Sequence, residues 1–419
     1  MILMNQIPSD GCIDSTLQLL CEGYQFIQNR CLQYESEVIQ TRLMGHKVLC
    51  MSGAGAAQIF YNPKYFKRKG VAPKRIQKSV FGENGVQSLD GSAHIHRKLM
   101  FMSIMTQENI KRLSKITTAH WRITTCKWED KNRLVLFKES QKILCKIACQ
   151  WAGVMLEEKE VCYRASDLGK MVDAFGGVGP RYCEGKCARK RTEKWIEDMI
   201  VKVRTHRILP EDYTALYIVS WHRNKEDKLL SIKTAAVELI NILRPIVAIA
   251  TYITFGALAL YEHPHCRKKL QSGNDQYVTM FVQEVRRYYP FAPFVGAFVR
   301  RNFIWKRYYF KKGTRVLFDI YGTNHDSSLW KRPDEFLPER FLHRPNNSFD
   351  FVPQGGGDYN TGHRCAGELA TIEIMKVSLC FLVTYMKYKI PRQNLKYSLT
   401  RIPSLPKSGF VISNIKLVN

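Results

Sequence analysis

The stretch Phe351-Val-Pro-Gln-Gly-Gly-Gly-Asp-Tyr-Asn-Thr-Gly-His-Arg-Cys365-Ala-Gly-Glu368 decides the fold of this chain. It places one cysteine after a glycine-rich loop and before an apolar run, Leu369 to Leu382, that suits a helix. Free backbone N–H groups and the positive end of the dipole favour a thiolate at the start of a helix. Arg364 adds a cation beside the sulfur. We therefore expect Cys365 to be an anionic metal ligand, of the kind that a haem iron needs on its proximal side.

The bulk composition is that of a large globular protein with an unusual charge. The chain has 419 residues, 45% of them hydrophobic, which is enough for a sizeable core. Its 64 basic and 37 acidic residues give a net charge of +27. Such a surface attracts acidic proteins, membrane surfaces, nucleic acids and fatty carboxylates, and charge alone selects none of them.

The cysteines and the apolar runs indicate the cellular compartment of the protein and whether it spans a membrane. The 13 cysteines follow neither a disulfide framework nor convincing zinc spacing, so we expect reduced thiols in a cytoplasmic protein. The first eight residues lack the features of a signal peptide. The longest nearly uncharged run, Pro245 to Tyr261, is short for a membrane span, so we predict a buried helix and no span.

No repeat or low-complexity linker divides the chain, so we expect one continuous domain over residues 1–419, mainly α with minor β. The basic segment 181–191 is interpreted as a solvated loop and helix start. A hairpin is predicted over 38–51, turning near Gly45, and further strands over 298–320 and in the tail. Helices are expected at 17–34, 54–61, 73–81, after 91, in several pieces over 107–207, at 231–262, at 277–289 and after Cys365.

The Cys365 loop resembles the cysteine-ligand loop of cytochrome P-450 enzymes, and most closely that of the bacterial fatty-acid peroxygenases. The resemblance covers nearly the whole chain and includes Gly91, His94, Arg244-Pro245, Tyr288-Tyr-Pro-Phe291 and Gln354-Gly-Gly-Gly-Asp358. It implies the cytochrome P-450 fold, with a long central helix over haem b and Cys365 as the axial ligand of the iron. It also implies that Glu284, Arg287 and Arg340 form a buried structural network.

His94 and Lys98 lie one helical turn apart. Many family members have tryptophan and arginine at these positions, donating to a haem propionate, so the resemblance implies the same role here. Both side chains can donate to a carboxylate. The alternative is an ordinary basic helix surface.

Arg244-Pro245 interrupts the apolar run of the expected central helix. Typical oxygen-activating members carry an acid–alcohol pair in this helix, and here the apolar run contains no acid. A guanidinium in such a run needs an anion, and Pro245 should bend the helix. The alternative is a structural salt bridge from Arg244 to Glu238 or another acid.

The resemblance implies that Arg244 holds the carboxylate of a long-chain fatty acid, and that this carboxylate moves the proton of hydrogen peroxide. Hydroxylation at carbon 2 or 3 would follow, without an obligatory redox partner. Hydroxylating members carry glutamine where alkene-forming members carry histidine, so Gln87 indicates hydroxylation with at most minor decarboxylation. Phe81, Phe291 and Phe294 are candidate walls of an apolar channel, although aromatic residues at such positions are more often core.

Three other functions are compatible with parts of the pattern. A reductase-dependent cytochrome P-450 monooxygenase could dock an acidic electron carrier on the basic surface. A nucleic-acid-binding protein would bind oligonucleotides in a salt-sensitive way and hold no haem, but the chain has no recognisable nucleic-acid motif. A haem carrier or sensor would bind the cofactor without turnover. Turnover with peroxide alone distinguishes the peroxygenase from all three.

Overall fold

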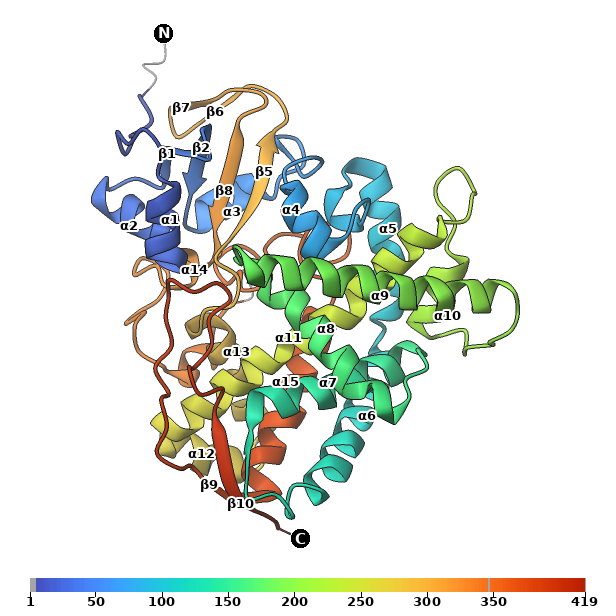
Figure 1. Cartoon of the computed structure of the whole chain (residues 1–419). Coiled ribbons are helices and arrows are strands. Elements are labelled where there is room, and N and C mark those ends of the chain that lie inside the picture. The colour runs from blue at the N-terminus through green and yellow to red at the C-terminus, as the bar shows by residue number, and fades with distance from the viewer. Residues whose placement is uncertain (1–4, 346, 419) are drawn as a thin grey trace.

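The computed structural model describes residues 5–345 and 347–418, and helices dominate it (Figure 1). The α-helices are α1 (Thr16–Glu22), α2 (Phe26–Gln33), α3 (Ala54–Phe60), α4 (Lys74–Ile76), α5 (Gly91–Ile104), α6 (Gln107–Cys126), α7 (Leu136–Ala152), α8 (Val161–Asp173), α9 (Pro180–Arg204), α10 (Ala215–Trp221), α11 (Ile232–Glu262), α12 (Pro264–Gln271), α13 (Asp275–Tyr288), α14 (Ile320–Asn324) and α15 (Glu368–Thr384). This mainly helical composition with minor β confirms the predicted fold class.

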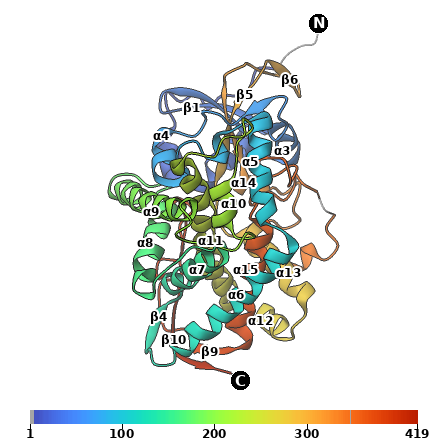
Figure 2. The same cartoon turned by 90° about the vertical axis from the view of Figure 1, so that its right-hand side faces the viewer.

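The strands form three small sheets. They are β1 (Val38–Leu43), β2 (His46–Met51), β3 (Phe66–Lys67), β4 (Arg133–Val135), β5 (Phe294–Val299), β6 (Phe303–Trp305), β7 (Tyr308–Phe310), β8 (Arg315–Asp319), β9 (Met386–Lys389) and β10 (Val411–Leu417). The largest sheet has the order β1-β2-β8-β5-β3, with only β2 and β8 parallel. A second sheet, β4-β10-β9, lies at the opposite end of the molecule (Figures 1 and 2), and β6 pairs with β7 alone.

Helix α11 is the axis of the helical core, with α7, α8 and α15 beside it (Figure 1). Its first turn is capped by Ser231, whose hydroxyl accepts from the Thr234 N–H at 3.1 Å. Its second half, after Pro245, is mainly apolar and buried on almost all sides, whereas its first half also buries Glu238, Asn241 and Arg244. It is long and apolar enough to cross a membrane, yet 94% of its most apolar 18-residue window is buried inside the protein. The prediction of a buried central helix is therefore confirmed.

Two predicted helices are shorter than expected. The segment 17–34 is broken at Gly23, which has a φ of 56° and approaches the carbonyl of Leu399 so closely that a Cβ would lie 2.1 Å away. The segment 73–81 forms α4 and then a π-turn, Gln77–Phe81, which ends at Gly82. In the first segment a distant part of the chain overrides the local helical pattern.

Three other local predictions need correction. The segment 181–191 follows the first residue of α9, so the predicted helix start is confirmed, whereas the predicted loop is wrong and Arg189 is only 1% exposed. Strand β4 was not expected in the stretch 107–207, and the strands of the main sheet begin earlier than predicted, at Phe294. The hairpin over 38–51, with its turn at Gly45, is confirmed.

Candidate active site

Cys365 lies at the end of the glycine-rich loop, just before α15 begins at Glu368. Gly355 and Gly357 in this loop have φ values of 91° and 83°, which side chains disfavour. A Cβ at either position would lie 3.1 or 3.2 Å from Tyr61, tighter than ordinary packing allows. The loop therefore requires these glycines to bring its backbone into position.

The surroundings of the Cys365 sulfur differ from the expectation. Burial raises the pKa of the thiol, and the carboxylate of Glu368 adds to the rise. The Gly367 N–H and the Gln354 amide act in the opposite direction, and Gln354 Nε2 lies 3.7 Å from Sγ. The N–H group at the helix start favours the thiolate, as expected, but burial outweighs it. A half-buried sulfur with donors directed at it fits a metal ligand, because a coordinating cation removes the proton outright.

Arg364 is held by an ion-pair network that the sequence did not reveal. Its Nε donates to Glu368 Oε2 at 2.6 Å. Arg286, whose side chain is fully buried, binds the other oxygen of Glu368 at 2.5 Å and also donates to Gln354 Oε1 at 2.8 Å. The only sequence signal for Arg286 was its place in the motif 284–287. The network fixes the Gln354 amide that faces the sulfur.

His94 and Lys98 are buried on α5, at 5% and 4% exposure, so the alternative of a basic helix surface is wrong. The His94 ring stacks on His363 with 3.8 Å between centroids. Burial, reinforced by the charge of Lys98, lowers the pKa of His94 to about 4, so its imidazole is neutral at pH 7. Burial and the nearby charge of Arg68 lower the pKa of His363 to about 2. Lys98 donates to the Arg364 carbonyl, which brings this cluster to the cysteine loop. These buried donors suit carboxylate groups.

Arg244 is 6% exposed and has no carboxylate within 4.0 Å in the part of the chain that the structure describes. It donates to the Val80 carbonyl, and its guanidinium carbon lies 5.6 Å from the centroid of the Phe81 ring. The alternative partner, Glu238, is bound by Arg97 at 2.6 Å. The predicted alternative of an Arg244–Glu238 salt bridge is therefore excluded.

The electrostatics around Arg244 leave its charge uncompensated. Burial lowers its pKa, and the charge of Arg189 lowers it further. Arg189 has its own acid, Glu193, at 2.7 Å. A negative charge on Cys365 would raise the pKa of Arg244, so these two groups act on each other. An anion beside Arg244 would stabilise this arrangement.

Gln87 lies near the same part of α11. Its Oε1 accepts from Asn241 Nδ2 at 3.3 Å, and the same Nδ2 lies 3.4 Å from Glu238 Oε2. Asn241 is one helical turn before Arg244, and its Oδ1 is buried without a hydrogen-bond partner among the described atoms. Asn241 lies in no motif, so the sequence alone does not identify it.

The three candidate phenylalanines lie in different surroundings. Phe81 contacts Arg244, and its ring meets Phe175 edge-on at 6.3 Å. Phe291 instead stacks on Tyr252 at 4.3 Å. Phe294 lies on β5 and packs against the small core cluster beneath α2. Pro245 lies inside α11, directly after Arg244.

The network of Glu284, Arg287 and Arg340 is confirmed. Arg287 binds Glu284 at 2.8 Å and Arg340 binds it at 3.1 Å, with Glu284 fully buried. The Leu337 N–H also donates to Glu284, at 2.8 Å. The network ties α13 to the turn Pro338–Phe341 and is structural.

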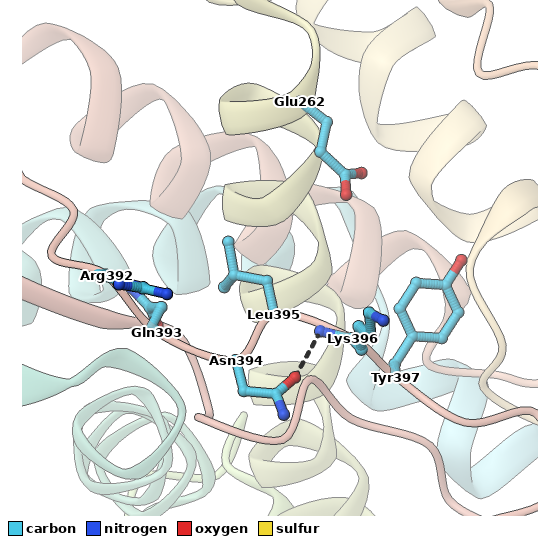
Figure 3. A pocket seen from close by; sticks show the side chains of 7 residues that line it. All are labelled: Glu262, Arg392, Gln393, Asn394, Leu395, Lys396 and Tyr397. Atoms are coloured by element: carbon cyan, nitrogen blue, oxygen red, sulfur yellow. Dashed lines mark hydrogen bonds between the residues drawn. The ribbon is translucent and has the colours of Figure 1, made fainter.

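A surface hollow lies elsewhere, between the end of α11 at Glu262 and the segment 392–397 (Figure 3). Lys396 N–H donates to Asn394 Oδ1 at 3.1 Å within it. None of the predicted site residues lines this hollow.

A mainly helical fold with a cysteine loop before α15, and with His94 and Lys98 buried on α5, is compatible with a haem-thiolate protein. Residues 184–412 match the family model for cytochrome P-450. The chain is 42% identical to the structure of cytochrome P-450EX alpha (CYP152N1) with myristic acid, with a TM-score of 0.95 over 99% of this chain and 100% of that one. It is 36% identical to a variant of cytochrome P-450 OleT in complex with arachidonic acid, with a TM-score of 0.97 and 99% of each chain covered.

A curated relative, cytochrome P-450 3A11 of Mus musculus, is 26% identical over 49% of this chain, and the match spans about half of that protein, 46%. The chain belongs to the cytochrome P-450 family, in the group of fatty-acid peroxygenases, and is an oxidoreductase whose cofactor is haem b. The donors around Cys365 and the buried cluster on α5 fit that cofactor.

Proposed function

We propose that this protein hydroxylates long-chain fatty acids at carbon 2 or carbon 3, using hydrogen peroxide. The single observation that carries the proposal is Arg244, a buried guanidinium with no acidic partner among the described residues. A fatty-acid carboxylate supplies the missing anion through two charge-assisted hydrogen bonds. The relatives with bound myristic and arachidonic acid support this substrate class.

We assign the haem contacts from the donors present. Cys365 would ligate the iron, with Gln354 and the Gly367 N–H donating to its sulfur. His94 and Lys98, both on α5, would donate to the haem propionates. When bound, haem supplies the oxidising power of the reaction, and a thiolate ligand donates electron density that favours cleavage of the O–O bond.

The carboxylate of the substrate moves the proton of hydrogen peroxide. Glu238, the acid of α11 nearest to Arg244 in sequence, is bound to Arg97 and is not free to serve. The carboxylate that Arg244 holds is then the group placed to take a proton from peroxide and return it. A fatty-acid derivative whose carboxylate is blocked, such as an ester, should therefore be a poor substrate. It should also fail to promote the reaction of hydrogen peroxide.

The position of oxidation follows from the same contact. A carboxylate fixed at Arg244 brings the first carbons of the chain closest to the reacting centre, which favours carbons 2 and 3. Phe81, which contacts Arg244, bounds this end of the chain, with Pro245 beside it. Phe291 and Phe294 bound the channel farther along. Gln87 is a neutral amide that does not titrate near pH 7, so hydroxylation prevails over decarboxylation to the terminal alkene.

This function needs fatty acid and hydrogen peroxide and no obligatory redox partner. A reductase-dependent monooxygenase is the alternative, and the basic surface would serve it as a docking site. The loss of an acid from the apolar part of α11 favours the peroxygenase, because oxygen activation by a reductase needs a proton source there.

The test is turnover by the purified holoenzyme with a saturated fatty acid and hydrogen peroxide, with products identified by mass spectrometry. We expect 2- and 3-hydroxy acids with peroxide alone. The methyl ester of the same acid is the matched control and should give no product. Turnover that requires a reductase and NADPH would overturn the proposal, whereas a terminal alkene as the main product would overturn only the role of Gln87.

A further inference from the structure

The net charge of +27 is unevenly distributed along the chain. Residues 64–78 and residues 300–315 each contain seven lysines and arginines and no aspartate or glutamate. Strand β3, inside the first segment, pairs with β5, which ends directly before the second, so that Phe66 lies opposite Val299. The Arg300 N–H also donates to the Tyr65 carbonyl at 2.7 Å. The fold therefore brings two acid-free segments side by side.

Most of these cations have no acidic partner in the described residues. Lys306 pairs with Glu37, and Arg300 lies 3.7 Å from Asp90. Other cations there are exposed and occur in no salt bridge among the described residues, namely Lys64, Lys69, Arg301, Arg307, Lys311 and Lys312. Their charge is directed to solvent.

The hairpin β6–β7 adds an apolar element to this charge. Its inner residues, Phe303 and Phe310, stack at 4.6 Å in the core. Its outer pair, Ile304 and Tyr309, stand opposite each other across the strands and are 50% and 43% exposed. An exposed aliphatic and aromatic pair, flanked by cations, is typical of a surface that enters the headgroup region of a bilayer.

The turn of the hairpin β6–β7 has a backbone conformation that most side chains disfavour. Lys306 and Arg307 form its two-residue turn with φ values of 48° and 66°. Glycine and asparagine are strongly preferred in such a turn, because side chains disfavour positive φ. Lys306 pairs with Glu37, whereas the side chain of Arg307 occurs in no salt bridge among the described residues.

We propose that this face docks on a lipid bilayer that carries anionic headgroups. We define the basic hairpin face by Arg301, Ile304, Arg307, Tyr309, Lys311 and Lys312. The cations attract the headgroups, and Ile304 and Tyr309 enter the interface. A nucleic acid would use the cations and could stack on Tyr309, but it gives no role to the aliphatic Ile304.

The test is co-sedimentation of the holoenzyme with vesicles, which does not depend on turnover. We expect binding to vesicles of mixed phosphatidylglycerol and phosphatidylcholine, none to phosphatidylcholine alone, and loss of binding at high salt. The double variant Lys311→Ala, Lys312→Ala should bind on the order of 25-fold more weakly, about fivefold for each cation. Haem absorption and melting temperature verify that each variant is folded.

The matched control removes two lysines from the opposite end of the molecule (Figures 1 and 2). Lys387 and Lys389 on β9 are exposed, and their double alanine variant should bind vesicles like the wild type. An equal loss in this control would show an effect of net charge alone and overturn the proposal. Equal binding to phosphatidylcholine alone would also overturn it.

A second variant separates lipid from nucleic acid. Ile304→Ser should weaken vesicle binding at low salt and leave the binding of a single-stranded oligonucleotide unchanged. If the oligonucleotide binds more tightly than the vesicles, displaces them, and is lost in the Lys311→Ala, Lys312→Ala variant, the face is a nucleic-acid surface and the proposal is wrong.

Discussion

Arg244 is the residue whose surroundings say most about the ligand, because a buried charge without a partner is unstable. We predict that Arg244→Ala leaves the haem in place and weakens fatty-acid binding by roughly 100-fold, since two charge-assisted hydrogen bonds are lost. The measurement is a titration of the haem absorption spectrum with fatty acid. Arg244→Lys keeps the charge but cannot make the two parallel hydrogen bonds of a guanidinium. Its affinity for fatty acid should therefore lie between those of the wild type and Arg244→Ala. If Arg244→Ala binds fatty acid with unchanged affinity, Arg244 does not hold the carboxylate.

Gln87 offers a second test at the same scale. We predict that Gln87→His raises the share of terminal alkene among the products, because an imidazole can exchange a proton near pH 7 and an amide cannot. The product ratio from mass spectrometry is the measurement. Gln87→Asn keeps an amide and is the control, with hydroxy acids as the main product. If the histidine variant gives the wild-type ratio, Gln87 does not select the outcome.

At the scale of single elements, the structure shows which predictions could be made from the sequence. Helix α11 was predictable because its N-cap at Ser231 and its apolar run are local signals. The break at Gly23 was not, because it depends on the backbone of Leu399, far along the chain. Strand β4 was missed for the same reason, since it pairs with β10 through Val135 and Val411.

The residues of the candidate site also fall into two groups, those that the sequence reveals and those that only the fold brings together. Cys365, His94, Lys98 and Arg244 were found because each lies in a motif that the sequence displays. The groups that support them become visible only when separate segments meet, as Asn241 meets Gln87 and as His363 stacks on His94. Another group of this kind is Arg286, which joins Glu368 to Gln354. A cation or amide of this kind carries no local pattern.

The joint between α13 and the turn Pro338–Phe341 leads to a stability prediction. We expect Glu284→Gln to lower the free energy of unfolding by about 3–5 kcal/mol, because it leaves the buried Arg287 and the partly buried Arg340 without their acid. The matched control is Glu335→Gln, whose exposed pair with Arg332 contributes at most about 1 kcal/mol. Denaturant unfolding of the holoenzyme measures both. Similar losses in the two variants would contradict the buried network.

The start of α14 leads to a prediction of pH dependence. Asp319 caps this helix, accepting from the Gly322 N–H at 2.8 Å, and burial raises its pKa to about 7. A carboxyl group with a raised folded pKa binds more protons in the folded state, so its contribution to stability is present below about pH 4 and is lost as pH rises to about 7. We expect Asp319→Asn, which can still cap the helix, to remove this dependence of up to roughly 4 kcal/mol. Thermal unfolding from pH 4 to 8 measures it, and an identical pH profile in the variant would refute it.

At the scale of the whole molecule, the two ends differ in chemistry. The end with the main sheet carries the acid-free segments 64–78 and 300–315, and the end with β9 and β10 lies opposite (Figure 1). Composition predicted the total charge but not its place, because the two segments are far apart in sequence and meet through the pairing of β3 with β5. The fold thus converts a diffuse excess of lysine and arginine into one face.

The haem-free protein should be markedly less stable than the holoenzyme. Without the cofactor, burial lowers the pKa values of Arg68 and Lys98, whose cationic forms are disfavoured there. The carboxylates of a bound haem would stabilise these two cations. Binding to the folded state alone stabilises it by about 4 kcal/mol when haem is present at 1,000 times its dissociation constant. We therefore expect the melting temperature to fall on extraction of haem and to recover when haem is added back. The matched control is Cys365→Ala, which keeps the basic cluster but loses the iron ligand and should recover only in part. If the haem-free protein has the same melting temperature as the holoenzyme, the basic cluster does not need the cofactor for its stability.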